Sequence, residues 1–207
     1  PMVNPDGIAL SQFGESALRS PELVQLIQAC YVYDVATKRT KSTYGTYLSR
    51  WKANARGVDL NRNFLPGFGV NAKTSHPSYM GYKGLAPFTE PETLSLGAVT
   101  LLCQPAIILN YHSMGEVAYW NTVENKYTAL NTDFSNYLLS LVPYKKMGSG
   151  TASGSYLDWV FNGDNPVCSI TLETGNVDCP FSLEHYPRIW LQHALVIQAT
   201  AEYAYIH

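Results

Sequence analysis

The alternation of apolar and polar stretches predicts two buried strands, each of which ends in a polar side chain. One apolar run begins at Ile107 and ends in His112, and a second begins at Cys168 and ends in Glu173. Short runs rich in branched aliphatic residues are typical of buried strands. In open α/β sheets, ligands bind beyond the carboxyl ends of the strands. The pattern therefore places a histidine and a glutamate where such a sheet carries its chemistry.

Helices are predicted before, between and after these strands. The four predicted helices cover residues 20–27, 89–102 and 129–141, and the stretch from 187 onward. Glu90 and Glu92 lie in a Thr-x-x-Glu pattern, which indicates helix capping and helix-dipole roles rather than catalysis. Residues 37–49 are polar and predict an exposed loop or a weak hairpin. Strands that alternate with helices predict an α/β fold.

Composition narrows the class of protein. The chain has 207 residues, which suits one domain with a substantial core, and 46% of them are hydrophobic. The net charge of −2 gives no electrostatic basis for binding nucleic acid or an anionic membrane. No apolar stretch reaches the roughly 18 residues that a membrane span needs. We therefore expect a globular protein with neither nucleic acid nor membrane as a partner.

Four cysteines are present, and none of their spacings is that of a zinc site. Cys103 lies in an apolar helical stretch and is predicted to be a small core residue. Cys168 and Cys179 flank a predicted strand and its following loop, close enough in sequence to form a disulfide. The sequence leaves a disulfide and two free thiols equally open.

Residues at the two strand ends and in one preceding loop carry the candidate chemistry. The imidazole of His112 can bind a metal or move a proton, and the carboxylate of Glu173 can act as a general base. In the loop, Arg62 offers a fixed fork of donors that suits a carboxylate or an oxyanion. Two structural alternatives stay open. His112 can be a hydrogen-bonded core residue, and Arg62 with its two flanking asparagines can tie loops together.

An ordered set of motifs spans nearly the whole chain. The motifs are Asn4-Pro5-Asp6-Gly7, Gly57-Val58-Asp59-Leu60-Asn61-Arg62-Asn63-Phe64, Tyr82-Lys83-Gly84, Phe88-Thr89-Glu90-Pro91-Glu92-Thr93, Tyr111-His112-Ser113, Asp158-Trp159 and Thr171-Leu172-Glu173. Together they resemble the zinc metallocarboxypeptidase family. Trp51-Lys52-Ala53-Asn54 and the Tyr-His-Ser-x-Gly-Glu-x-x-Tyr-Trp run from Tyr111 resemble a bacterial branch of that family. This branch includes γ-D-glutamyl-meso-diaminopimelate peptidases, which cut peptidoglycan stem peptides.

The resemblance implies a mixed, twisted sheet flanked by helices on both faces. It implies one zinc ion, with His112 as the third ligand, and Glu173 as the general base. The family's first two ligands come from a His-x-x-Glu motif, which this chain lacks. We therefore expect residues 1–207 to be the carboxyl-terminal part of a single catalytic domain. The two further ligands are expected upstream of Pro1, and the 207 residues alone are expected to be inactive.

The resemblance also implies which residues bind the substrate's carboxylate and polarise its scissile carbonyl. Arg62, together with Asn61, would bind the terminal carboxylate of the substrate. The family's second cationic residue, which polarises the scissile carbonyl, follows a tryptophan. Lys52 holds that place after Trp51, and Arg56 is a possible substitute.

Three further residues are implied to contact the substrate, namely Ser113, Tyr156 and Leu157. The family's flap tyrosine aligns with the glycine-rich stretch around residue 150, so Tyr156 is the candidate to replace it. Leu157 stands at the base of the specificity pocket. An apolar base favours an apolar substrate side chain and does not suit charged diaminopimelate.

The expected function is hydrolysis of a peptide bond near a free carboxylate, with peptidoglycan stem peptides as substrate. One alternative is a metallocarboxypeptidase that acts on ordinary peptides with apolar carboxyl termini. Another is a non-catalytic domain that binds peptides or cell wall and has lost its zinc site. The resemblance implies a bacterial protein that is extracellular or associated with the cell wall.

Overall fold

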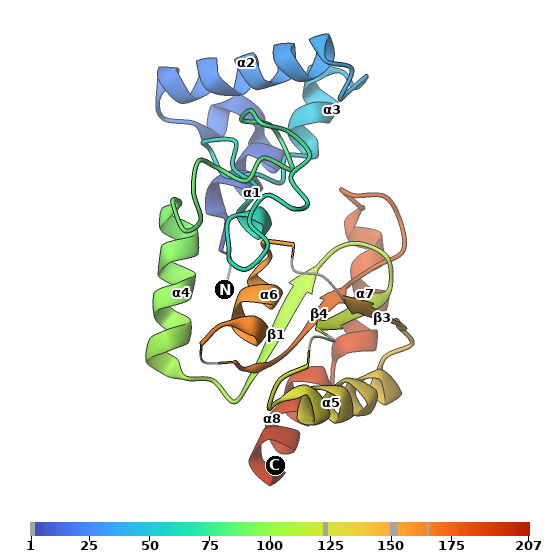
Figure 1. Cartoon of the computed structure of the whole chain (residues 1–207). Coiled ribbons are helices and arrows are strands. Elements are labelled where there is room, and N and C mark those ends of the chain that lie inside the picture. The colour runs from blue at the N-terminus through green and yellow to red at the C-terminus, as the bar shows by residue number, and fades with distance from the viewer. Residues whose placement is uncertain (1–2, 122–123, 150–152, 165) are drawn as a thin grey trace. The chain divides into compact units, whose positions relative to one another are not determined.

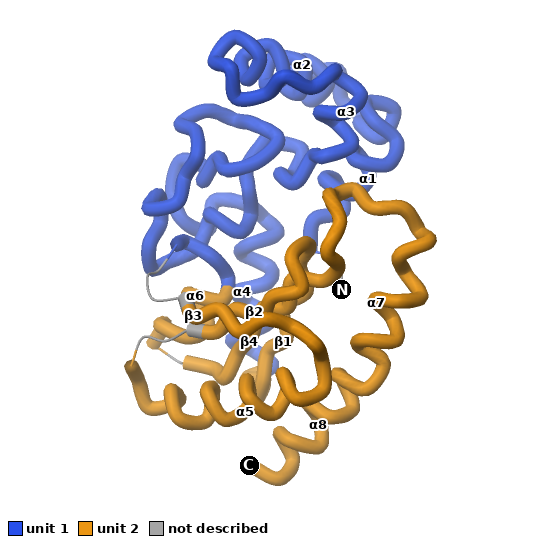
Figure 2. The backbone as a smooth tube through the Cα atoms, turned by 90° about the vertical axis from the view of Figure 1, so that its right-hand side faces the viewer, with its two compact units in different colours: residues 1–103, 153–156 blue, residues 104–152, 157–207 orange. Residues whose placement is uncertain are grey.

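The chain forms two compact units (Figure 2). Each unit has its own cluster of buried hydrophobic side chains. The computed structural model describes residues 3–121, 124–149, 153–164 and 166–207. Unit 1 comprises Pro1–Cys103 and Ser153–Tyr156, and unit 2 comprises Gln104–Ala152 and Leu157–His207. That the 207 residues are part of one catalytic domain stays a prediction.

Unit 1 is built from helices and long loops (Figure 1). Its helices are α1 (Pro5–Phe13), η1 (Gly14–Ala17), α2 (Pro21–Ala36), α3 (Tyr44–Ser49), η2 (Leu60–Arg62) and α4 (Pro91–Cys103). The α1 start follows from its sequence, because the Asn4 side chain accepts a hydrogen bond from the Gly7 N–H at 3.0 Å. Pro5 occupies the first turn, where a missing N–H costs nothing. The predicted starts near Pro21 and Pro91 are confirmed.

The core of unit 1 corrects one prediction. Its members are Leu10, Ile27, Cys30, Tyr47, Leu48, Trp51 and Ala53. The expected exposed loop or hairpin at 37–49 is wrong in its second half, because the last six of these residues form α3. Tyr47 and Leu48 are buried there, and the Tyr47 hydroxyl donates to the buried carboxylate of Asp34 at 2.7 Å. Long-range packing therefore makes a helix of a segment whose composition is that of a loop.

The described residues of unit 2 include a four-stranded mixed sheet with the strand order β1-β4-β2-β3. Its strands are β1 (Ile107–His112), β2 (Val117–Asn121), β3 (Lys145–Ser149) and β4 (Cys168–Glu173). β1 runs parallel to β4, β4 antiparallel to β2, and β2 parallel to β3. Both predicted strands are confirmed, and so is the mixed α/β class.

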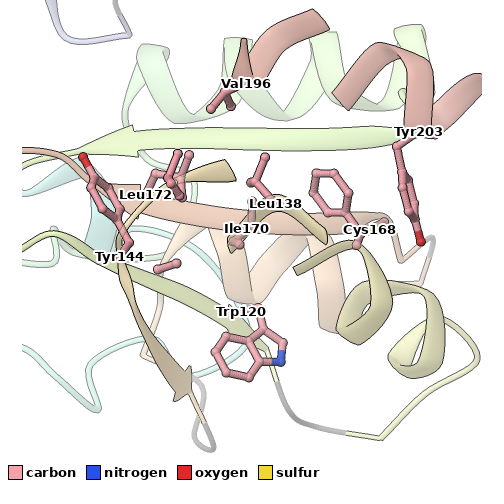
Figure 3. Close-up of a cluster of buried hydrophobic side chains, with 11 residues drawn as sticks. Trp120, Leu138, Tyr144, Cys168, Ile170, Leu172, Val196 and Tyr203 are labelled. Carbon is pink, nitrogen blue, oxygen red and sulfur yellow. The ribbon is translucent and has the colours of Figure 1, made fainter. Parts of the chain in front are cut away.

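Helices cover this sheet and bury its apolar side chains. They are α5 (Thr128–Leu141), α6 (Tyr156–Asn162, whose first residue belongs to unit 1), η3 (Leu183–His185), α7 (Tyr186–His193) and α8 (Val196–Ile206). Figure 3 shows the core cluster, to which β4 contributes Ile170 and Leu172, α5 contributes Leu138, and α8 contributes Val196. Side chains alternate along a strand, so Glu173 belongs to the opposite face of the sheet from Leu172. The core therefore fixes the direction in which the strand end presents its carboxylate.

The carboxyl-terminal helical stretch differs in detail from its prediction. Pro187 lies in the first turn of α7, but the single helix expected from this point is divided into α7 and α8. Within the described ranges, no helix is both long enough and apolar enough to cross a membrane.

The cysteines lie in different environments. Cys103 is exposed at the end of α4, so its predicted core position is wrong. Cys30 and Cys168 are buried, and burial raises the pKa of each thiol to about 12. All four cysteines lie in the described part of the chain and are free, so Cys168 and Cys179 form no disulfide in this structure.

Candidate active site

His112 and Glu173 end neighbouring parallel strands and lie in register. The pairing of β1 with β4 runs from Ile107 opposite Cys168 to His112 opposite Glu173. On its other side, Glu173 pairs with Val117 of β2. Paired residues of neighbouring strands point to the same face of a sheet. The structure thus brings an imidazole and a carboxylate, 61 positions apart in the sequence, together at one end of the sheet.

Hydrogen bonds from the residue that follows β4 join the ends of the two strands. The Thr174 N–H donates to the His112 carbonyl at 2.8 Å, and the Thr174 hydroxyl donates to the same oxygen at 3.0 Å. Both His112 and Glu173 are half-buried. A carboxylate in such a position remains within reach of water, which a general base requires.

A catalytic zinc site requires about three protein ligands. Among the described residues, no group of three or more histidine, cysteine, aspartate or glutamate side chains is placed to hold a metal ion. His112 is a single candidate ligand. The residues that the structure describes therefore do not by themselves make a zinc site, and the chemistry of a metal does not follow from them.

Arg62 and Asn61 lie in η2 of unit 1. The Arg62 Nη1 donates to the Asn61 carbonyl at 2.6 Å, while its Nε is buried and is among the described polar atoms that have no hydrogen-bond partner. The Asn61 side chain accepts a hydrogen bond from the Tyr156 N–H at 3.0 Å. A buried donor without a partner is costly to the fold. The anion-binding role of Arg62 stays a prediction.

Asn63 has the structural role that the sequence left open for this cluster. It is fully buried, and its amide group donates to the carbonyls of Lys83 and Ala86 at 2.8 and 2.9 Å. Its side-chain oxygen accepts from the Thr89 N–H and from the Thr93 hydroxyl. Asn63 thus ties the loop that precedes α4 to the segment that carries Arg62.

Lys52 and Arg56, the two candidates for polarising the substrate carbonyl, each lie near a buried carboxylate. Lys52 Nζ lies 3.2 Å from the Asp59 carboxylate, which also accepts from the Gly81 N–H at 2.9 Å. Arg56 Nη1 lies 3.7 Å from the Glu90 carboxylate, and 62% of the Arg56 side chain is exposed. The role of either residue toward a substrate stays a prediction.

Glu90 has partners that the sequence did not indicate. It directly precedes α4, in agreement with a role at the helix start, and its carbonyl accepts the Leu94 N–H. Its carboxylate is almost fully buried and accepts from the Asn54 amide at 2.8 Å. The Asn54 side-chain oxygen in turn accepts from the backbone N–H groups of Arg56 and Val58. This network shapes the loop after Trp51.

The remaining predicted substrate contacts lie in different settings. Tyr156 begins α6, its hydroxyl lies 2.6 Å from the Thr100 hydroxyl, and burial raises its pKa. Leu157 is 5% exposed and belongs to unit 2, whereas Ser113 is exposed just after β1. The centre of the glycine-rich stretch, at 150–152, lies outside the described residues.

The sequence did not indicate a polar cluster around Glu116, which follows β1 by four residues. Glu116 binds Arg188 and Gln192 of α7. The only signal for it was the position of Glu116 in the run that begins at Tyr111. Arg188 and Gln192 lie more than 70 residues away from Glu116 in the sequence, and no pattern in the sequence indicates the contact.

Comparisons with known proteins agree with this architecture. A family model described as zinc carboxypeptidase matches residues 1–187. The chain is 29% identical over 199 residues to gamma-D-glutamyl-L-diamino acid endopeptidase 1 of Lysinibacillus sphaericus. This alignment covers 95% of the chain and 46% of that protein. It is 32% identical over 124 residues to the uncharacterized protein YqgT of Bacillus subtilis (strain 168), covering 58% of the chain and 29% of that protein. The chain therefore spans less than half the length of both relatives.

A solved structure shows the same fold. The crystal structure of carboxypeptidase A from Helicoverpa armigera aligns with a TM-score of 0.62 and 18% sequence identity. The alignment covers 99% of this chain and 50% of that one. The mixed sheet flanked by helices is thus a carboxypeptidase fold.

Proposed function

Since the chain belongs to the zinc carboxypeptidase family, we propose that the whole protein containing it is a zinc-dependent peptidase of the bacterial cell wall. Its substrate would be a peptidoglycan stem peptide, cut at an amide bond near a free carboxylate. The name of the Lysinibacillus sphaericus relative, an endopeptidase for gamma-D-glutamyl-L-diamino acid peptides, supports this substrate. Such a substrate would locate the protein outside the cytoplasm of a bacterium.

The observation that carries the proposal is the register of His112 opposite Glu173 at the end of two parallel strands. In our proposal, Glu173 takes the proton of the attacking water, and a carboxylate next to a bound substrate is suited to that step. Arg62 would bind the substrate's free carboxylate through its guanidinium group, whose planar fork of donors suits a carboxylate. His112 would be one zinc ligand, and the other ligands would come from the rest of the whole protein, because its relatives are more than twice as long.

One observation favours a second substrate class. Leu157, at the position predicted for the base of the specificity pocket, is an apolar and almost fully buried side chain. An apolar pocket discriminates weakly between similar apolar groups but cannot pair a charge. A carboxypeptidase that removes apolar residues from ordinary peptides is therefore the alternative to be tested.

Product analysis on the complete protein separates the two substrates. The protein is incubated with the stem tripeptide L-Ala-γ-D-Glu-meso-diaminopimelate and, separately, with an N-acylated dipeptide that ends in phenylalanine or leucine. We expect mass spectrometry to detect free diaminopimelate together with the dipeptide L-Ala-D-Glu from the first substrate, and little product from the second. Release of only the apolar amino acid would establish the alternative, and hydrolysis of neither would leave the non-catalytic binding domain.

The metal role of His112 is tested by the zinc content of the complete protein. We expect His112→Ala to lose most of its zinc, because a catalytic site depends on each of about three protein ligands. His185→Ala, which removes a partly exposed histidine of η3, is the matched control and should retain zinc. Zinc that stays at the wild-type stoichiometry in His112→Ala would exclude His112 as a ligand.

A further inference from the structure

Two loops leave the sheet directly after His112 and Glu173, and backbone hydrogen bonds join them. The N–H groups of Gly115 and Glu116 both donate to the Gly175 carbonyl, at 2.7 and 3.1 Å. Gly115 and Gly175 have φ values of +147° and +74°, a region that favours glycine. We name residues 113–116 the β1 loop and residues 174–176 the β4 loop. Their geometry depends on these contacts.

The side chain of Glu116 anchors the β1 loop to α7. Its Oε1 lies 2.5 Å from Arg188 Nη2 and accepts from the Gln192 amide at 3.1 Å. Arg188 and Gln192 are four residues apart on the helix, so they lie on one face of α7. Glu116 itself has a φ of +50°, which non-glycine residues rarely adopt, so this backbone needs contacts that hold it.

Arg188 also contacts the β4 loop. Its Nη1 donates to the Asn176 side-chain oxygen at 3.2 Å, while the Asn176 amide donates to Glu116 Oε2 at 3.4 Å. The planar guanidinium group presents donors at fixed angles, so one arginine can hold both loops at a set spacing. Glu116 is followed by Val117, which pairs with Glu173 across the sheet. A shift of the β1 loop is therefore transmitted to the strand end that carries the proposed base.

We propose that Arg188 is a positioning residue for the peptidase reaction. Through Glu116 and Asn176 it sets the spacing of the two loops that follow His112 and Glu173. This inference rests on the proposed function of those two residues. Arg188 does not touch the reacting atoms in this proposal, and its effect on turnover passes through the loops.

The test compares Arg188→Ala, Arg188→Lys and Gln198→Ala in the complete protein. Gln198→Ala is the matched control, because it removes a surface hydrogen bond between residues four apart on α8, to Glu202 at 2.8 Å. Steady-state kinetics are to be measured at 25 °C, after circular dichroism has been used to check that each variant is folded at this temperature. Hydrogen exchange of the segment that contains Gly115 and Glu116 is measured in parallel.

We expect Arg188→Ala to lower kcat by about ten- to a hundredfold with KM within about twofold of wild type, because small misplacements at a site are costly. Arg188→Lys keeps one charge for Glu116 but cannot also hold Asn176, so its kcat should lie in between. Exchange of the β1 loop should speed up in Arg188→Ala and not in Gln198→Ala. If Arg188 only stabilises the fold, Arg188→Ala should lower Tm but leave the kcat of the folded protein unchanged. Arg188→Lys would then have no loss of kcat to restore.

The outcomes separate this inference from the proposed function. If wild-type protein hydrolyses neither peptide, the proposed function is wrong, and the positioning role falls with it whatever the exchange data show. If the wild type is active and Arg188→Ala retains kcat within twofold, only the positioning role is wrong. Unchanged exchange of the β1 loop in Arg188→Ala would also overturn it.

Discussion

Replacement of Asn63 should destabilise the fold around the predicted anion-binding segment. The side chain is fully buried and takes part in five hydrogen bonds. Its amide donates to the Lys83 carbonyl, the Ala86 carbonyl and the Thr89 hydroxyl, at 2.8, 2.9 and 3.2 Å. Its oxygen accepts from the Thr89 N–H and the Thr93 hydroxyl, at 3.1 and 2.9 Å. No other residue type of this size can donate and accept in this pattern.

The magnitude follows from these bonds. The amide nitrogen has only two hydrogens for its three acceptors, so the side chain makes at most four full hydrogen bonds at once. At about 1 kcal/mol net each, these suggest a loss of at most about 4 kcal/mol in Asn63→Ala. Ala86 and Thr89 are exposed and can regain water, whereas Thr93 is fully buried and cannot. We therefore expect the free energy of unfolding to fall by about 3 kcal/mol.

Asn63→Asp retains the shape and the two accepted bonds but replaces the amide donor by a carboxylate oxygen, which would face the carbonyl oxygens of Lys83 and Ala86. We expect a loss of about 3 kcal/mol or more at pH 7. The carbonyl oxygens would raise the pKa of the new carboxyl group above its unfolded value of about 3.9. The folded state would then bind more protons, so the stability of this variant should rise as the pH falls toward that range.

Denaturant unfolding of the complete protein at pH 7 and pH 5 measures both effects. The matched control is Asn136→Asp, the same change at an exposed residue of α5 whose oxygen accepts from Lys146 at 2.5 Å. It should stay within about 0.5 kcal/mol of wild type. Losses below about 1 kcal/mol in both Asn63 variants would refute the view that this network holds the loops.

Two further predictions follow from burial. A thiol reagent at pH 8 should label exposed Cys103 rapidly, and Cys103→Ser should abolish that fast phase. Cys30 and Cys168 should label only on unfolding, because burial raises the pKa of both to about 12 and thiolate is the reactive form. Burial also lowers the pKa of His193, so the unfolded chain binds more protons below about pH 6.5 and stability should fall with the pH there. Tm measured at pH 5 and pH 7 should show a smaller difference in His193→Gln than in wild type.

The sequence predicted β1 and β4 because their apolar runs are local signals, whereas β2 and β3 were not predicted. Ile107–His112 and Cys168–Glu173 form strands as expected, and Pro21 and Pro91 begin helices. The helix at 44–49 was missed because Tyr47 is held by a hydrogen bond to Asp34. Such a contact between distant parts of the chain leaves no periodic pattern in a polar segment.

The candidate site was predictable as a set of residue types, but its pairing was not. His112 and Glu173 were each placed at a strand end, and only the structure shows that the two strands are neighbours in register. The Glu116 and Arg188 contact was missed for the same reason, since 72 positions separate them in the sequence. Side-chain chemistry is visible in a sequence, whereas the strand order that brings it together depends on the whole core.

The most direct test of the central claim is the turnover of Glu173→Gln in the complete protein. We expect kcat on the susceptible peptide to fall by about 10²- to 10⁴-fold, because the amide cannot take a proton from water. Calorimetry should show that the variant still binds the peptide, and Glu184→Gln, at an exposed glutamate of η3, should retain full activity. Turnover of Glu173→Gln at the wild-type rate would contradict the assignment of Glu173 as the general base.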